Sequence, residues 1–314
     1  MFLSFSSYLF FFVLGSCIIY YIIIPFSKRF VLPASDLSRY NHKKRWALIT
    51  GGTDGIGKAL VLELLKRDWK HFIILGRSPE KASNLENIMK KNGAKVHIIL
   101  RDLTKMDHQQ MDDLIESLFN LYDIALLINN LSITPDVFPG PFIDHETDEV
   151  SHILNINIIF PTKLIHSFIK NNARKKSALM IISSFAGTVS TPLMSLYSAT
   201  KSFQLHLGQS LATECRSENI DVTVIVPGAT VPTSISKSLN QEKASWLTGT
   251  SSPESVAKGS LDVLGIETIW SPTWVHDIQS QIFTRLPEYL QQRILMMVNS
   301  VIYKRMKIET SNRL

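Results

Sequence analysis

The fold is decided by one stretch of the chain, WALITGGTDGIG at residues 46–57. Its first five residues are apolar or β-branched and predict a buried strand. A glycine-rich turn follows, and beyond it leucines recur at helical spacing. A strand, a glycine turn and a helix in this order place free backbone amides at a helix N-terminus, where a pyrophosphate binds. The stretch therefore predicts a dinucleotide-binding unit.

The rest of the chain continues this alternation of strands and helices. Helices are expected near residues 56–68, 80–92 and 107–120, and further strands at 72–75, 96–100, 124–128, 178–183 and 222–226. Strands that alternate with helices through short loops form a parallel sheet that is covered on both faces. We therefore expect an α/β fold of the Rossmann type, with a doubly wound parallel sheet.

The end of the second strand predicts which dinucleotide binds. A carboxylate there would bond the adenosine 2′-hydroxyl and select NAD. Gly76 stands at that position instead, and Arg77 follows it. A cation favours the 2′-phosphate of NADP, although Arg77 could instead stack on the adenine. Asp102, just beyond the third strand, is suited to bond the adenine amino group.

Tyr197 and Lys201 are four residues apart and therefore share one face of a helix. A phenol has a pKa near ~10, and a nearby cation lowers it. One charge at ~4 Å supplies about the 4 kcal/mol that a shift of three units requires. The pair predicts a tyrosine that acts as acid and base, although the same spacing also arises by chance on amphipathic helices.

Four motifs occur in one order: the glycine turn, the asparagine pair at 129–130, Ser184 and the Tyr197–Lys201 pair. Over roughly residues 45–265 they resemble the short-chain dehydrogenase/reductase family. The resemblance implies that Tyr197 donates a proton to a substrate carbonyl oxygen and that Ser184 bonds the same oxygen. It also implies that Lys201 holds the nicotinamide ribose and lowers the pKa of Tyr197.

The same resemblance implies an asparagine that holds a water in the proton relay. Asn155 and Asn157 are both candidates, and Asn157, which lies forty residues before Tyr197, is the one we expect. The implied cofactor is NADP(H), held by Gly51, Thr53, Asp54, Gly55, Ile56, Gly57, Arg77, Asp102, Asn129, Tyr197, Lys201 and Pro227.

The chain departs from the family at two positions. Ser132 stands where the family usually has glycine, and its side chain is expected to crowd the cofactor wall. The turn at Pro227 and Gly228 resembles the family's turn near the nicotinamide. The threonine expected after it is either Thr230 or Thr233, and the spacing does not decide between them.

Within the family, the likeness is to membrane-bound very-long-chain 3-ketoacyl-CoA reductases and the related 17β-hydroxysteroid dehydrogenases. It is carried by residues 46–47, 53–58, 182–184 and 196–201 and by the apolar N-terminus. It implies an NADPH-dependent reductase of a hydrophobic ketone, first of all a 3-ketoacyl-CoA. A steroid or 3-ketosphinganine oxidoreductase is the alternative, and a catalytically idle NADP-binding scaffold is a hypothesis of another class.

Residues 1–27 contain no charged side chain and are mostly apolar. A membrane-spanning helix needs about 20 such residues, and the uncharged start favours an anchor over a cleaved signal peptide. A basic linker follows at 28–44, and the excess of positive charge there predicts that the catalytic domain is cytosolic. We therefore expect a single-pass protein of the endoplasmic reticulum membrane.

The catalytic domain is expected at 45–270 and a helical extension at 271–314. The extension's apolar face could lie on the membrane, line an acyl groove, form a dimer or pack as core; it comprises Ile282, Phe283, Leu286, Leu290, Ile294, Met297, Val301 and Ile302. Because the family often pairs through its fourth and fifth helices, a homodimer is a hypothesis. No metal-ligand spacing is present, and a net charge of +6 without interleaved aromatic residues does not favour nucleic acid.

Overall fold

A seven-stranded parallel sheet forms the centre of the computed structural model, which describes residues 5–19, 24–233 and 249–311. The strand order is β3-β2-β1-β4-β5-β6-β7. The strands are β1 (Trp46–Thr50), β2 (His71–Gly76), β3 (Lys95–Leu100), β4 (Ile124–Asn129), β5 (Ser177–Ile182), β6 (Ile220–Ile225) and β7 (Ile269–Trp270). The first six confirm the predicted strands, and β7, which is only two residues long, is an addition.

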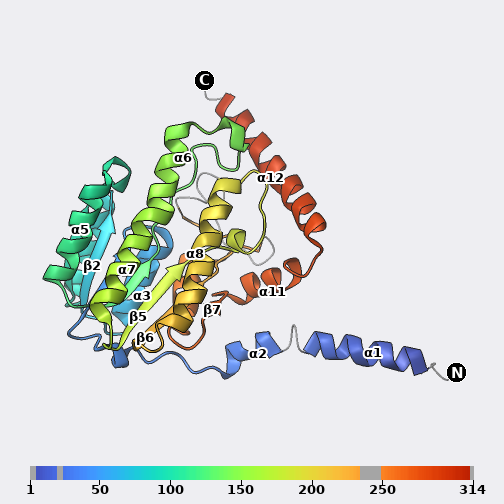
Figure 1. Ribbon diagram of the computed structural model, residues 1–314, viewed down its shortest axis with the longest axis horizontal. Helices are drawn as coiled ribbons and strands as arrows, with labels where there is room; N and C mark the ends of the chain where they lie inside the picture. The colour runs from blue at the N-terminus through green and yellow to red at the C-terminus, as the bar shows by residue number, and fades with distance from the viewer. Residues whose placement is uncertain (1–4, 20–23, 234–248, 312–314) are drawn as a thin grey trace.

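Helices cover both faces of the sheet (Figure 1). One core contains side chains of α3 (Gly55–Lys66), α4 (Pro79–Lys91) and α10 (Pro253–Leu261). The opposite core contains side chains of α5 (His108–Leu121), α7 (Phe160–Asn172) and α8 (Ser195–Glu214). Strand residues alternate between the two cores, as a pleated strand requires. In β1, Ala47 and Ile49 face α3, whereas Leu48 faces α7.

The strand order reverses between β1 and β4. Chain connections leave this point in opposite directions, so a crevice opens at the carboxyl ends of these two strands. The glycine turn follows β1, and the asparagine pair begins at the end of β4. The predicted Rossmann-type fold is confirmed, and it brings the glycine turn and the asparagine pair to the same edge of the sheet.

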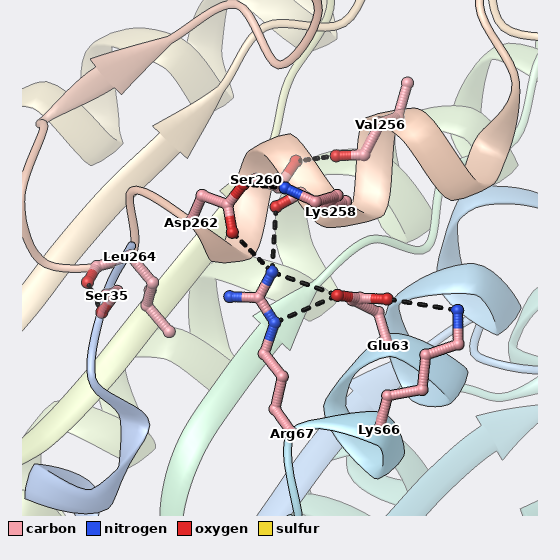
Figure 2. A network of polar contacts seen from close by, with 9 residues as sticks. All are labelled: Ser35, Glu63, Lys66, Arg67, Val256, Lys258, Ser260, Asp262 and Leu264. Carbon is pink, nitrogen blue, oxygen red and sulfur yellow. Dashed lines mark hydrogen bonds and ion pairs between the residues drawn. The ribbon is translucent and has the colours of Figure 1, made fainter. Parts of the chain in front are cut away.

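A polar network joins the C-terminal end of α3 to that of α10 (Figure 2). The Arg67 guanidinium donates to Glu63 Oε1 at 3.1 Å and to Asp262 Oδ1 at 2.6 Å. Asp262 also accepts from Lys258 Nζ at 2.8 Å. The Arg67 side chain is only 18% exposed, so these bonds fix the end of α3 relative to α10.

The basic segment expected as a linker is bonded to the rest of the domain. The side chain of Tyr40 is fully buried, and its hydroxyl donates to Asp221 Oδ2 at 2.6 Å. Arg45, directly after this segment, donates to both carboxylate oxygens of Asp123 and to Asn172 Oδ1. Arg29, in α2 (Ile24–Val31), pairs with Asp277 in α11 (Trp274–Phe283).

The apolar N-terminus contains α1 (Phe5–Ile18), which is fourteen residues long and projects from the domain (Figure 1). Within the described ranges, no helix has the length and apolarity that crossing a membrane requires. The predicted anchor at 1–27 also includes 1–4 and 20–23, which lie outside those ranges.

The C-terminal extension consists of two helices, α11 (Trp274–Phe283) and α12 (Glu288–Ser311). The apolar residues predicted to form a face of this extension are therefore divided between two helices. Pro287 precedes α12, and a proline cannot continue a helix that arrives from its N-terminal side. Within α12, Leu290, Met297 and Val301 are exposed, whereas Asn299 is buried.

The elements between the strands complete the fold. They are the short helical turns η2 (Leu37–Tyr40), η3 (Leu103–Lys105), η4 (Phe142–Asp144) and η6 (Phe185–Gly187), the helix α6 (Thr147–Leu154) and the π-helical turn η5 (Asn155–Ile159). The predicted substrate loop at 229–252 is described only at its two ends, because residues 234–248 lie outside the described ranges.

Candidate active site

The glycine turn has the conformation and the space that a phosphate cradle needs. Gly51 and Gly55 adopt φ values of +65° and +51°, a region that glycine enters without steric cost. A Cβ on Gly57 would lie 2.2 Å from the Gly51 carbonyl oxygen, so no other residue fits there. Asp54 caps α3 by accepting a hydrogen bond from the Gly55 amide at 2.8 Å. The turn thus presents backbone at the N-terminus of α3, where an anion binds.

The adenosine end of the crevice has no room for a selecting carboxylate. A Cβ on Gly76 would lie 2.5 Å from Thr53 Cγ2, so a side chain at the end of β2 is excluded. The exposed Arg77 lines the crevice, as do Lys81 and Arg101, which the sequence did not indicate. Lys81 pairs with Asp54. These residues fit a dinucleotide that carries an extra phosphate at this end.

Asp102 also lines the crevice, as predicted. Its carboxylate accepts bonds from the Thr104 hydroxyl and amide. These bonds, with smaller contributions from nearby cations, lower the pKa of Asp102, so it is an ionised acceptor at neutral pH.

The two asparagines at 129–130 differ in their exposure to the crevice, which the sequence did not indicate. Asn129 is 1% exposed and does not line the crevice, whereas Asn130 does. The Asn130 amide donates to the carbonyls of Thr50 and Gly51, at 3.0 and 3.2 Å, and so ties β4 to the glycine turn. Ser132 lies in the crevice wall, as expected, and its buried hydroxyl has no hydrogen-bond partner within the described residues.

Ser184, Tyr197 and Lys201 line one cavity of about 450 Å³ that continues from the glycine turn. Ser184 follows β5, and Tyr197 lies in the first turn of α8. Two bonds dock α8 on the segment after β5: Ser198 Oγ donates to the Ala186 carbonyl, and Ser183 Oγ donates to the Lys201 carbonyl, both at 2.7 Å. The predicted catalytic pair and its serine are therefore brought together.

Burial controls the proton affinity of both members of the pair. It raises the pKa of Tyr197 to about 12, and a hydrogen bond from Ser184 opposes this change. It lowers the pKa of Lys201 to about 7. The predicted lowering of the tyrosine pKa by Lys201 is therefore not what the structure shows. The ammonium is 5.8 Å from the centre of the phenol ring and donates instead to the Ile182 carbonyl and to Gln204.

Asn157 lies within η5, and its side chain is fully buried. Oδ1 accepts from the Ile133 amide, and Nδ2 donates to the Ile133 carbonyl and to Thr200 Oγ1. The side chain thus joins the loop after β4 to α8 and does not line the cavity. Its backbone carbonyl accepts from Gln204 Nε2 at 2.8 Å. Asn155, the other candidate, bonds His108 on the outer side of the domain.

The turn that begins at Pro227 forms another wall of the cavity. The imidazole of His276, in α11, packs so closely against this turn that a Cβ on Gly228 would lie 2.7 Å from it. Its Nε2 bonds the Ala229 carbonyl at 3.0 Å. Thr230 and Thr233 both line the cavity, so both remain candidates for the threonine near the nicotinamide.

Phe138 and two residues of the C-terminal helix also line the cavity. The Phe138 ring meets the Tyr197 ring edge-on, with 5.2 Å between their centres. Leu295 and Asn299 reach the cavity from α12, and Asn299 Nδ2 donates to the Pro192 carbonyl at 2.8 Å. Across the described residues, no cluster of three or more His, Cys, Asp or Glu side chains is placed to bind a metal ion.

Comparison with known proteins identifies the family to which the chain belongs. The profile described as short chain dehydrogenase matches residues 45–244. A very-long-chain 3-oxoacyl-CoA reductase from Laccaria bicolor is 32% identical over 207 residues, which cover 65% of this chain and 61% of that protein. The 17-beta-hydroxysteroid dehydrogenase type 3 of Mus musculus is 30% identical, with 82% of this chain and 80% of that protein covered.

The fold has a close counterpart among solved structures. A structure described in connection with 7beta-hydroxysteroid dehydrogenase stereoselectivity superimposes with a TM-score of 0.72 at 21% identity. The superposition covers 81% of this chain and 98% of the other. The profile match, the Rossmann-type fold and the common location of Ser184, Tyr197 and Lys201 agree. The chain belongs to the short-chain dehydrogenase/reductase family, whose members are oxidoreductases that bind a nicotinamide cofactor.

Proposed function

We propose that the protein is an NADPH-dependent carbonyl reductase that acts on a hydrophobic ketone. The observation that carries the proposal is one cavity in which the hydroxyls of Ser184 and Tyr197 lie beside each other between the glycine turn and an apolar wall. A carbonyl oxygen bonded to both hydroxyls would be held where negative charge develops during reduction. When bound, the nicotinamide would supply the hydride.

Tyr197 would provide the proton. Because burial raises its pKa to about 12, the phenol stays protonated at neutral pH and is ready to donate. Lys201 has three N–H donors, of which two are used by the Ile182 carbonyl and Gln204. The third is available for a ribose hydroxyl, since Lys201 lines the cavity. Ser184 would orient the substrate oxygen towards the phenol.

The preference for NADPH over NADH is supported by charge and space. No carboxylate can occupy position 76, because Thr53 fills the space next to it. Arg77 and Arg101 add positive charge to the crevice at the same end. A 2′-phosphate is recognised by such cations, and arginine can bond it through two N–H groups at once.

We propose a 3-ketoacyl-CoA as the substrate, in a reaction of fatty acid elongation. The name of the Laccaria relative and the apolar wall of the cavity support this choice. The name of the mouse relative supports a steroid as the alternative, and 3-ketosphinganine is a second one. An idle NADP-binding scaffold is less well supported, because Ser184, Tyr197 and Lys201 share one cavity.

We further propose that residues 1–27 anchor the protein in the endoplasmic reticulum membrane by a single pass, with the catalytic domain (45–270) in the cytosol. The uncharged N-terminus and the exposed apolar side chains of α12 support a membrane partner. Residues 28–44 would then connect the anchor to the domain, and 271–314 would face the bilayer or the substrate. A homodimer is a further proposal, to be tested by sizing in detergent.

The proposed function is tested by following NADPH absorbance with purified protein in detergent. The panel contains 3-ketoacyl-CoA esters of increasing chain length, keto-steroids and 3-ketosphinganine. We expect turnover with NADPH to exceed turnover with NADH, and long-chain 3-ketoacyl-CoA to be the best substrate. Turnover of steroids alone would support the alternative substrate. If no ketone is turned over while NADPH binds, the scaffold hypothesis replaces the proposed activity.

A further inference from the structure

Gln204 is a buried polar side chain in contact with the active-site lysine. It lies in α8, three residues after Lys201, and is 2% exposed. Its Oε1 accepts from Lys201 Nζ at 3.0 Å, and its Nε2 donates to the Asn157 carbonyl at 2.8 Å. Both ends of the amide are therefore bonded, as a buried polar group requires.

The carbonyl that Gln204 bonds lacks its ordinary helical partner. In an α-helix, a carbonyl accepts from the N–H four residues further along the chain. Four residues after Asn157 stands Pro161, which has no N–H. Asn157 lies in the π-helical turn η5, and its carbonyl accepts from outside this turn, with the side-chain amide of Gln204 as the donor. This bond ties Gln204 to the buried residue Asn157 of η5.

Among the described residues, no carboxylate is recorded in contact with the Lys201 ammonium or acting on its pKa. Tyr197, on the same helix, is the titratable group that faces it, at 5.8 Å from ring centre to Nζ. From β5 the ammonium meets the Ile182 carbonyl, and through Gln204 it is linked to the Asn157 carbonyl of η5. The two acceptors of the ammonium are therefore both neutral.

We propose that Gln204 is a positioning residue for Lys201: its neutral amide connects the ammonium to the Asn157 carbonyl and leaves the remaining N–H directed to the dinucleotide. A carboxylate in the same place would bind the ammonium as an ion pair and hold its proton to higher pH. An apolar side chain would leave both the ammonium and the Asn157 carbonyl short of a partner. This inference rests on the NADPH-dependent function proposed above.

The test measures NADPH binding by the fluorescence of the bound nucleotide between pH 6 and pH 10, without any ketone. Affinity is expected to fall as pH rises through the titration of Lys201, and Lys201→Met should remove this pH dependence. Gln204→Glu should raise the pH midpoint of this fall in NADPH affinity by about 1–3 pH units. Gln204→Met should lower it, because the charged form loses an acceptor. Each variant is first checked for folding by circular dichroism.

Gln209→Glu is the matched control, because it makes the same chemical change on the same helix. It lies eight positions after Lys201, about 12 Å along the helix axis, so salt at ~0.1 M, with a Debye length of about 10 Å, largely screens its charge from the lysine. Its midpoint should equal that of the unmodified protein. If Gln204→Glu also leaves the midpoint there, the inference is overturned. If Gln204→Glu does not fold, the same comparison with Gln204→Met decides.

The two proposals fail in distinguishable ways. If the unmodified protein does not bind NADPH at any pH, the proposed function and this inference both fall. If NADPH binds with a pH midpoint that Lys201→Met abolishes but that neither Gln204 variant moves, only the inference falls.

Discussion

His276 should make the stability of the domain depend on pH between about 4 and 6.5. The imidazole is 2% exposed, and burial lowers its pKa to about 4 from the 6.5 of an exposed histidine. Within this window the unfolded chain binds a proton that the folded protein does not, so stability falls as pH falls. At pH 5 the linkage relation gives a loss of about 2 kcal/mol relative to neutral pH.

The assay compares urea unfolding of the unmodified protein with that of His276→Gln at pH 7.5 and pH 5. Glutamine can still donate to the Ala229 carbonyl but does not titrate. The unmodified protein should lose about 2 kcal/mol more than the variant over this range. The exposed His206 provides the control, since His206→Gln should behave as the unmodified protein. If unmodified protein and His276→Gln lose the same amount, the burial argument for His276 is refuted.

The active site and the Arg67 network can be tested by three further changes. Because burial lowers the pKa of Lys201 to about 7, roughly nine-tenths of the lysine is neutral at pH 8, and NADPH binding should take up nearly one proton at this pH. Calorimetry in buffers of different ionisation enthalpy should show this uptake. If Lys201→Met takes up the same proton, Lys201 is not the group that binds it. Arg77→Gln should weaken NADPH binding about 10- to 100-fold, as expected for losing a charged hydrogen bond, and leave NADH binding unchanged; equal losses for both would count against a 2′-phosphate contact. Arg67→Leu should lower the free energy of unfolding by about 1–3 kcal/mol, whereas Lys66→Leu, at a more exposed position, should lower it by less than about 1 kcal/mol. Urea unfolding measures both changes. Equal effects would mean that the Arg67 bonds in Figure 2 contribute little to stability.

The sequence predicted the sheet because the strands that build it are apolar runs with clear ends. The run at Ala47–Ile49 has no polar residue, and glycines that follow it can be read directly as a turn. Helical periodicity likewise placed Tyr197 and Lys201 on one face of α8. These features depend on residues that are close in sequence, and this is why they were predictable.

The features that were missed depend on partners far along the chain. Arg29 belongs to the basic segment at 28–44 that was expected as a linker, yet its partner Asp277 lies 248 residues away. The lysine was expected to lower the pKa of Tyr197, but burial, which sequence spacing does not show, has the larger effect. Gln204 carries no motif, and only the fold brings it to both Lys201 and the Asn157 carbonyl.

The proposed function requires Tyr197 to donate the proton to a ketone that NADPH reduces. The decisive measurement is single-turnover reduction of a long-chain 3-ketoacyl-CoA by the NADPH-loaded protein, with Tyr197→Phe compared with the unmodified protein. We expect the variant to be slower by about 10²- to 10⁴-fold and to retain its affinity for NADPH. If the variant reduces the ketone at the unmodified rate, Tyr197 is not the proton donor.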